Sequence, residues 1–185
     1  MHLIEAYSLY SGLKIDYPII KQEPVTGIDY QFILFNPHSK GEAKNYKRWQ
    51  EVVSIIKPEL DKQNIKILQL DSFETVYDGC IKIDNITYNQ TAWLTNRASC
   101  LLGIDSFCMH LASLFNKPML ILFGAHQCFN CCKPYFGDAS IQHFFLADLK
   151  GNKPTYSYDN GGEYLNEFKP EDIAKAFIKK IIKKL

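Results

Sequence analysis

The residues best placed to do chemistry stand at the start of a helix expected just after Ile104. Asp105 and Ser106 follow an apolar run there, and Ser106 is a candidate N-cap. The free amide groups of a helix start carry the positive end of the helix dipole, which suits an anion such as a diphosphate. His110 comes one helical turn later on the same face. The alternative is a simply capped helix with His110 packed in the core.

Polar residues also follow two other apolar runs. The loop after Phe35 carries three side chains that could contact a ribose or a phosphate: Asn36, His38 and Ser39. Asparagine before proline, and serine, are also ordinary turn formers, so turn chemistry is the alternative for this loop. Asp71 and Ser72 stand in the equivalent place after Leu70 and could reach a ribose hydroxyl.

A cluster of potential metal ligands follows the apolar run that ends at Phe123. It consists of four residues: His126, Cys128, Cys131 and Cys132. Zinc prefers four nitrogen and sulfur ligands in a tetrahedron, which this short loop offers. Strong zinc sites usually pair two separated ligand pairs, and the second pair is missing here. Zinc binding, a redox or disulfide role and incidental packing therefore all stay open, and the main interpretation requires no cofactor.

The elements that must position these residues alternate between short apolar runs and helical patterns. Strands are expected at residues 32–35, 65–70, 80–83, 98–104, 119–123 and 143–146. Helices are expected at residues 2–12, 91–97, 105–115 and 170–185, and from residue 49 to a proline at 58. This alternation predicts an α/β, Rossmann-like domain with a mainly parallel sheet and helices on both faces. Ligands of such folds bind beyond the carboxyl ends of the strands, where the candidate residues stand.

Bulk composition excludes several classes of function. The 185 residues suit one domain, and 46% hydrophobic with 22% charged residues is typical of a soluble globular protein. The net charge of +1 and the lack of a basic stripe outside the lysine-rich C-terminus argue against nucleic-acid binding. No apolar run approaches the roughly 20 residues that span a bilayer, and the N-terminus has no signal-peptide pattern. We therefore expect a cytoplasmic protein with reduced cysteines and no transmembrane segment.

Residues 103–124 resemble the signature of glycosyltransferase family 9, the ADP-heptose:lipopolysaccharide heptosyltransferases. The residues in register are Asp105, Ser106, His110, Leu111, Ala112, Lys117, Pro118, Phe123 and Gly124. Upstream, residues 35–39 resemble the first strand and turn of the family, and Lys47-Arg48-Trp49 its Lys-Arg-Trp motif. The resemblance implies the C-terminal half of a GT-B fold. Residues 1–29 would form a linker-like helix and extended segment, and residues 30–185 the nucleotide-sugar-binding domain.

The resemblance also implies a function. The domain would bind a nucleotide-diphosphate sugar and act with an acceptor-binding half or a separate acceptor-binding subunit. Lys47 resembles the family lysine that contacts the donor phosphates, although a solvated basic turn is the alternative. Phe107 and Cys108 replace the family's Gly-Pro, and His38 stands where glycine is usual, so the donor stays open. A non-catalytic nucleotide or nucleotide-sugar binding module is the second hypothesis, and the sequence names no catalytic base.

Overall fold

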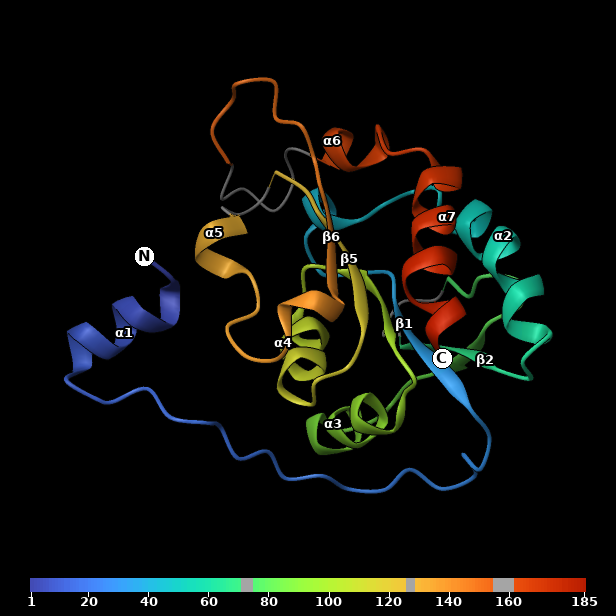
Figure 1. The fold of residues 1–185 in the computed structure, drawn as a ribbon, viewed down its shortest axis with the longest axis horizontal. Coiled ribbons are helices and arrows are strands. Elements are labelled where there is room, and N and C mark those ends of the chain that lie inside the picture. Colours follow the sequence, from blue (N-terminus) through green and yellow to red (C-terminus); the bar gives the residue numbers. More distant parts are fainter. Residues whose placement is uncertain (71–74, 126–128, 155–161) are drawn as a thin grey trace.

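Six parallel strands form one sheet in the order β3-β2-β1-β4-β5-β6 (Figure 1). The computed structural model describes residues 1–70, 75–125, 129–154 and 162–185. The strands are β1 (Phe32–Asn36), β2 (Lys66–Leu70), β3 (Ile81–Ile83), β4 (Leu101–Ile104), β5 (Met119–Phe123) and β6 (Gln142–Leu146). The expected Rossmann-like α/β class is confirmed, and every strand of the described residues is parallel to its neighbours.

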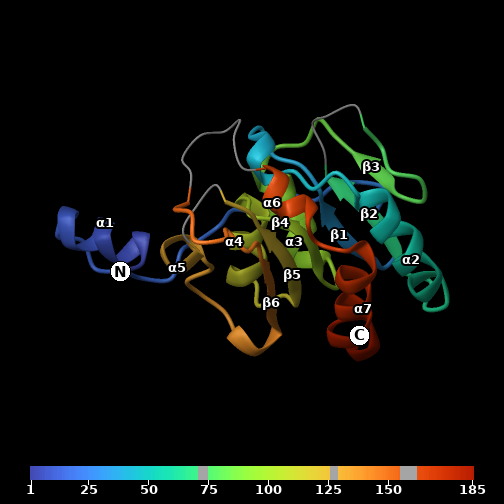
Figure 2. The ribbon, with the colours of Figure 1, turned by 90° about the horizontal axis from the view of Figure 1, so that it is seen from above.

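Helices cover both faces of the sheet. The helices of the described residues are α1 (Leu3–Ser11), which lies outside the sheet layers, α2 (Trp49–Asp61), α3 (Tyr88–Arg97), α4 (Phe107–Leu114), α5 (Phe129–Cys132), α6 (Gly162–Asn166) and α7 (Pro170–Lys180). These residues also form the 3-10 turns η1 (Glu42–Lys44), η2 (Ala139–Ile141) and η3 (Ile182–Lys184). Figures 1 and 2 show α7 beside α2, whereas α3 and α4 lie together elsewhere on the sheet.

Alternation along the strands divides the core into two layers. Ile33 and Phe35 of β1 pack with α2 and α7, whereas Phe32 and Leu34 pack with α3 and α4. Successive side chains of a strand point to opposite faces, so a strand buried on both faces is apolar throughout. Burial on both faces of the sheet therefore explains the continuous apolar runs of the sequence.

Local sequence sets where several elements begin and end. A capping box between Thr87 and Gln90 starts α3 at Tyr88, three residues earlier than the sequence pattern predicts. Ala98 closes α3 through its amide, and β4 therefore begins only at Leu101 instead of at residue 98. The C-terminal helix was expected to reach residue 185, but α7 ends at Lys180, and the chain continues as η3.

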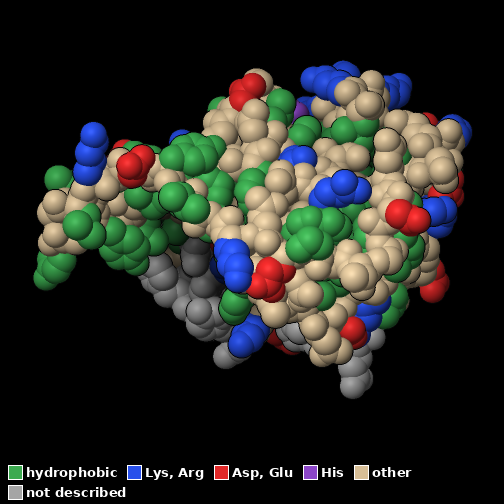
Figure 3. Space-filling model, turned by 90° about the horizontal axis from the view of Figure 1, so that it is seen from below, with side chains coloured by type: hydrophobic (Ala, Val, Ile, Leu, Met, Phe, Trp, Pro, Cys, Tyr) green, Lys and Arg blue, Asp and Glu red, His purple; other side chains and the backbone are tan. Residues whose placement is uncertain are grey.

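The N-terminal segment forms an arm outside the sheet. Tyr17 donates a hydrogen bond to the carbonyl of Leu114, and the amide of Glu23 donates to the carbonyl of Asn89, so the extended part follows α4 and α3. Helix α1 projects beyond the rest of the molecule and has no buried residue (Figures 1 and 2). Hydrophobic side chains cover much of this projection (Figure 3). Among the described residues, no helix has the length and apolar character needed to cross a membrane.

Candidate functional site

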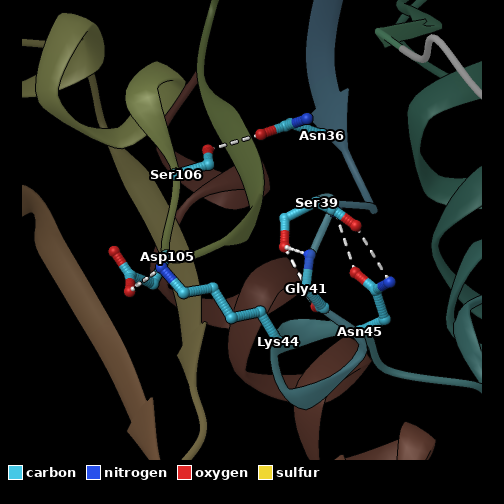
Figure 4. A network of polar contacts seen from close by, with 7 residues as sticks. All are labelled: Asn36, Ser39, Gly41, Lys44, Asn45, Asp105 and Ser106. Atoms are coloured by element: carbon cyan, nitrogen blue, oxygen red, sulfur yellow. Dashed lines mark hydrogen bonds and ion pairs between the residues drawn. The ribbon is translucent and has the colours of Figure 1, made fainter. Parts of the chain in front are cut away.

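The carboxyl ends of β1 and β4 are held unusually close together. Gly103 pairs with Asn36 in the sheet, and a Cβ atom on Gly103 would lie 2.6 Å from the Asn36 carbonyl oxygen. Glycine is therefore required at this position for the two strands to approach. Just beyond it, the hydroxyl of Ser106 donates a hydrogen bond to the side-chain oxygen of Asn36 (Figure 4). Two of the predicted site residues thus meet directly.

A buried ion pair lies beside this contact. Nζ of Lys44 is 2.8 Å from Oδ2 of Asp105, and the two side chains are only 14% and 8% exposed. Lys44 comes from η1, which sits against the end of β5 because Gly124 has no side chain. A Cβ atom there would lie 2.8 Å from the carbonyl oxygen of Ala43. Figure 4 shows the Lys44 side chain extending towards Asp105.

Side-chain contacts fold the loop between β1 and η1 into a fixed turn. The Ser39 amide donates to Oδ1 of Asn45 at 2.8 Å, and Asn45 Nδ2 donates back to the Ser39 carbonyl at 3.1 Å. The Ser39 hydroxyl forms hydrogen bonds with the backbone of Gly41 (Figure 4). Ser39 therefore helps to form the turn, as the alternative to ligand contact predicts. His38 stacks on Tyr77, and its Nε2 lies 2.8 Å from the tyrosine hydroxyl.

Helix α4 begins next to these loops. Ser106 occupies the expected N-cap position with extended backbone, but its side chain makes no capping bond to the helix. The hydroxyl is directed to Asn36 instead, which leaves the first turn of α4 without a side-chain cap from this residue. The helix start therefore keeps the amides and the positive dipole end that an anion would use.

His110 lies one turn into α4, as the spacing predicts. Its side chain keeps solvent contact, yet the protein packed around it desolvates the ring and lowers its pKa below the ordinary histidine value. The Asp105 carboxylate opposes this shift, whereas His2 and Lys44 add to it. The imidazole is therefore neutral at pH 7.

Two hollows open at this edge of the sheet and share Ser106 and Phe107. The larger has a volume of about 720 Å³ and is lined by Asn36, His38, Ser39, Leu70, Ile83, Asp84, Asn85, Ile86, Thr87, Tyr88, Thr91, Ser106, Phe107 and Cys108. The smaller, of about 410 Å³, is lined by His2, Leu3, Ile4, Lys44, Asp105, Ser106, Phe107, His110 and Cys132. Asn36, His38 and Ser39 thus line the larger hollow. Asp105 and His110 line the smaller one.

Other predicted residues lie elsewhere. Lys47 is exposed and lines neither hollow, and its backbone amide donates to Oδ1 of Asn166 at 2.8 Å. Asp71 and Ser72 fall outside the described residues. Sequence reasoning missed Lys44, whose ammonium group pairs with Asp105.

The predicted zinc cluster is described only in part. His126 and Cys128 lie outside the described residues, whereas Cys131 and Cys132 belong to α5 and are half-buried. In the described parts of the chain, no three histidine, cysteine or acidic side chains converge as metal ligands would. Zinc binding stays a prediction from the sequence.

The remaining described cysteines have the properties of core residues. Burial raises the pKa of the Cys80 and Cys108 thiols to about 12, and it raises that of the fully buried Cys100 thiol as well. Since the thiolate is the reactive form of cysteine, these raised pKa values argue against a nucleophilic role for the three thiols near neutral pH.

Comparisons with known proteins place the fold. The sequence matches no protein-family model and none of the curated proteins. Among solved structures, the chain resembles E. coli ADP-heptose LPS heptosyltransferase II, with 13% identity, a TM-score of 0.61 and coverage of 97% of this chain and 51% of that one. It resembles E. coli heptosyltransferase WaaC with ADP at 13% identity and a TM-score of 0.62, covering 95% and 54% of the two chains. The glycosyl transferase family 9 structure from Veillonella parvula gives 16% identity, a TM-score of 0.61 and coverage of 98% and 51%. The chain therefore shares the fold of one half of these glycosyltransferases and spans about half their length.

Proposed function

We propose that this chain binds the nucleoside diphosphate part of a nucleotide sugar and serves as the donor-binding half of a glycosyltransferase. The observation that carries the proposal is a pair of side-chain contacts close to the carboxyl ends of β1 and β4. Ser106 is bonded to Asn36, and Lys44 is paired with Asp105, on either side of the start of α4. Polar and charged groups thus gather beyond the carboxyl ends of parallel strands, where ligands of this fold class bind.

The diphosphate would lie at the start of α4, over Ser106. An ammonium group has three N–H donors, so Lys44 can hold Asp105 and still donate to a phosphate oxygen. The first-turn amides of α4 add donors and a favourable dipole. A nearby positive charge also stabilises a diphosphate leaving group, which is the electrostatic work that such a transferase requires.

The larger hollow suits the nucleoside. Its volume of about 720 Å³ falls within the usual range of small-molecule sites. The hollow combines apolar side chains with polar ones that can fix orientation: Leu70, Ile83 and Ile86 on one hand, and Asn36, Asp84, Asn85 and Thr87 on the other. The smaller hollow, beyond Phe107, then takes the sugar.

The N-terminal arm supports the proposed dependence on another half. Leu9 is 72% exposed, Tyr10 97%, Leu13 71% and Ile19 99%, and α1 buries none of its own residues. An apolar surface of this kind, on a chain half as long as the structures it resembles, suits contact with a second domain or subunit. That second half would hold the acceptor and supply the general base.

Calorimetric titration of the purified chain with ADP, UDP, pyrophosphate and adenosine tests the binding proposal. We expect the three phosphate-bearing ligands to bind and adenosine to bind more weakly than ADP. If adenosine bound as tightly as ADP, or if no phosphate-bearing ligand bound, the anion site would be wrong.

Incubation with nucleotide sugars then separates the two functional hypotheses. Release of free nucleoside diphosphate, when an acceptor-binding half and an acceptor with a free hydroxyl group are added together, supports the transferase. Tight binding without release, under the same conditions, favours the non-catalytic binding module.

A further inference from the structure

Two exposed aromatic rings stand at the mouth of the larger hollow. Tyr88 is the first residue of α3, and Phe107 is the first residue of α4. The ring centroids are 5.6 Å apart, and the ring planes meet at 80°, in an edge-to-face contact. Tyr88 is 80% exposed and Phe107 46%, so large ring surfaces face solvent beside a cavity. Core packing does not account for this position.

The backbone holds both rings in fixed places. The capping box of Thr87 and Gln90 sets the start of α3, and the bond from Ser106 to Asn36 sets the start of α4. A site built on helix starts places its side chains more precisely than one built on a loop. The backbone positions of Tyr88 and Phe107 are therefore fixed, and the edge-to-face contact between the rings restrains their orientation.

Both rings line the hollow, together with Leu70, Ile83 and Ile86. Phe107 also lines the smaller hollow, and it thus separates the two. A flat apolar group that entered the larger hollow would cover solvent-exposed ring surface and meet aliphatic side chains in the same cavity. Phosphates offer no apolar face, whereas every nucleobase has a planar π-face.

We propose that Tyr88 and Phe107 form an aromatic clip that stacks on the base of the bound nucleotide. This inference rests on the proposed function, because it assigns the base end of the same ligand. Stacking depends on the π-face and is tolerant of base identity, so the clip contributes affinity for nucleotides in general. Choice among bases falls to the polar residues of the β3–α3 segment, Asp84, Asn85 and Thr87.

Matched substitutions at Tyr88 give the first test. Tyr88→Ala removes the ring and should weaken ADP and UDP binding about tenfold, in the range measured for base–aromatic stacking. Tyr88→Phe keeps the ring and should retain wild-type affinity. Pyrophosphate has no base, so its affinity should not change in either variant. Tyr10→Ala, at a tyrosine that is 97% exposed on α1, is the control for loss of a surface ring.

Phe107→Ala and Phe107→Tyr repeat the comparison at the other ring. Nuclear magnetic resonance supplies a readout that general destabilisation does not move, because stacking shifts the base protons of bound ADP upfield by the ring current. We expect that shift in the wild type and in Tyr88→Phe, and we expect it to shrink in Tyr88→Ala.

The outcomes separate the clip from the proposed function. If ADP and UDP bind no tighter than pyrophosphate does, the clip is overturned and the anion site survives. The same holds if Tyr88→Ala and Phe107→Ala leave the affinity for ADP and UDP unchanged. If pyrophosphate, ADP and UDP all fail to bind, the proposed function is overturned, and the clip with it.

Discussion

Lys44 reaches from the 3-10 turn after β1 to Asp105 at the end of β4, with 2.8 Å between Nζ and Oδ2. The pair joins two loops that lie far apart in the sequence and places a cation beside the start of α4. Two charges this well shielded from water must compensate each other, because a lone buried charge is strongly unfavourable. The pair is therefore a structural link, and the ammonium group keeps N–H donors that Asp105 does not use.

Two lysines of one loop should differ sharply in nucleotide binding. Lys44→Met should weaken ADP and pyrophosphate binding by about tenfold to a hundredfold, the effect of losing a charged hydrogen bond. Lys47→Met should have little effect, since Lys47 is exposed and lines neither hollow. Calorimetry at a temperature where circular dichroism shows both variants folded makes the comparison. Stronger weakening by Lys47→Met would restore the sequence-based assignment.

Stability should show the cost of splitting the pair. Lys44→Met leaves Asp105 without its partner in a buried position and should lower the free energy of unfolding by about 3 kcal/mol. The double variant Lys44→Met/Asp105→Leu removes both charges and should be more stable than the single one. Urea denaturation of the wild type, both single variants and the double variant gives the coupling energy. Additive losses would show that the two side chains act independently.

The sequence predicts the strands of the sheet well because each buried strand leaves its own continuous apolar run. Strands buried on both faces leave continuous apolar runs such as residues 119–123, and all six expected strands are present. The helix limits were less accurate where short-range contacts decide them. Thr87 and Gln90 form a capping-box pattern that, read as such, places Tyr88 at the start of α3. That signal would also have brought Tyr88 to the candidate site.

Lys44 could not be found in this way. It lies in a three-residue 3-10 turn, which is too short to leave a periodic pattern, and its partner comes from a distant strand. Lys47 lies two residues before Trp49, but Trp49 is fully buried, whereas Lys47 itself is exposed. The sequence does predict that Asn36, Asp105, Ser106 and His110 lie near one another, since parallel strands bring their carboxyl ends to one edge of the sheet.

Gly103 should tolerate no side chain. A methyl group there would meet the Asn36 carbonyl oxygen at 2.6 Å, so Gly103→Ala must push β4 away from β1. We expect a loss of about 1–3 kcal/mol in the free energy of unfolding, as for overpacked cores, and weaker ADP binding because Ser106 moves from Asn36. Gly162→Ala is a milder comparison, since its Cβ atom would lie 3.0 Å from the Glu42 carbonyl oxygen and needs a smaller shift. Equal losses in urea denaturation would contradict this account of Gly103.

Nucleotide affinity should depend on pH through His110. Desolvation lowers the pKa of this histidine in the unliganded protein, so the ring is neutral at pH 7. A bound diphosphate brings negative charge and favours the protonated ring, so binding takes up a proton and tightens as the pH falls below 7. The rise in ADP affinity from pH 8 to pH 6 should be a few-fold larger in the wild type than in His110→Gln. If the wild type and His110→Gln showed the same dependence of ADP affinity on pH, His110 would not contact the phosphates.

The exposed arm should be dispensable for folding but not for association. Helix α1 has nine residues and buries none of them, so replacing Leu9 and Leu13 with glutamate should change the free energy of unfolding by no more than about 0.5 kcal/mol. The same change removes the centre of a large apolar surface, and such surfaces drive association. In sedimentation velocity, the wild type should associate as its concentration rises, and the variant should stay monomeric. A loss of several kcal/mol in the variant would show instead that Leu9 and Leu13 pack on the domain in solution, which would leave no free apolar face there for a second half to cover.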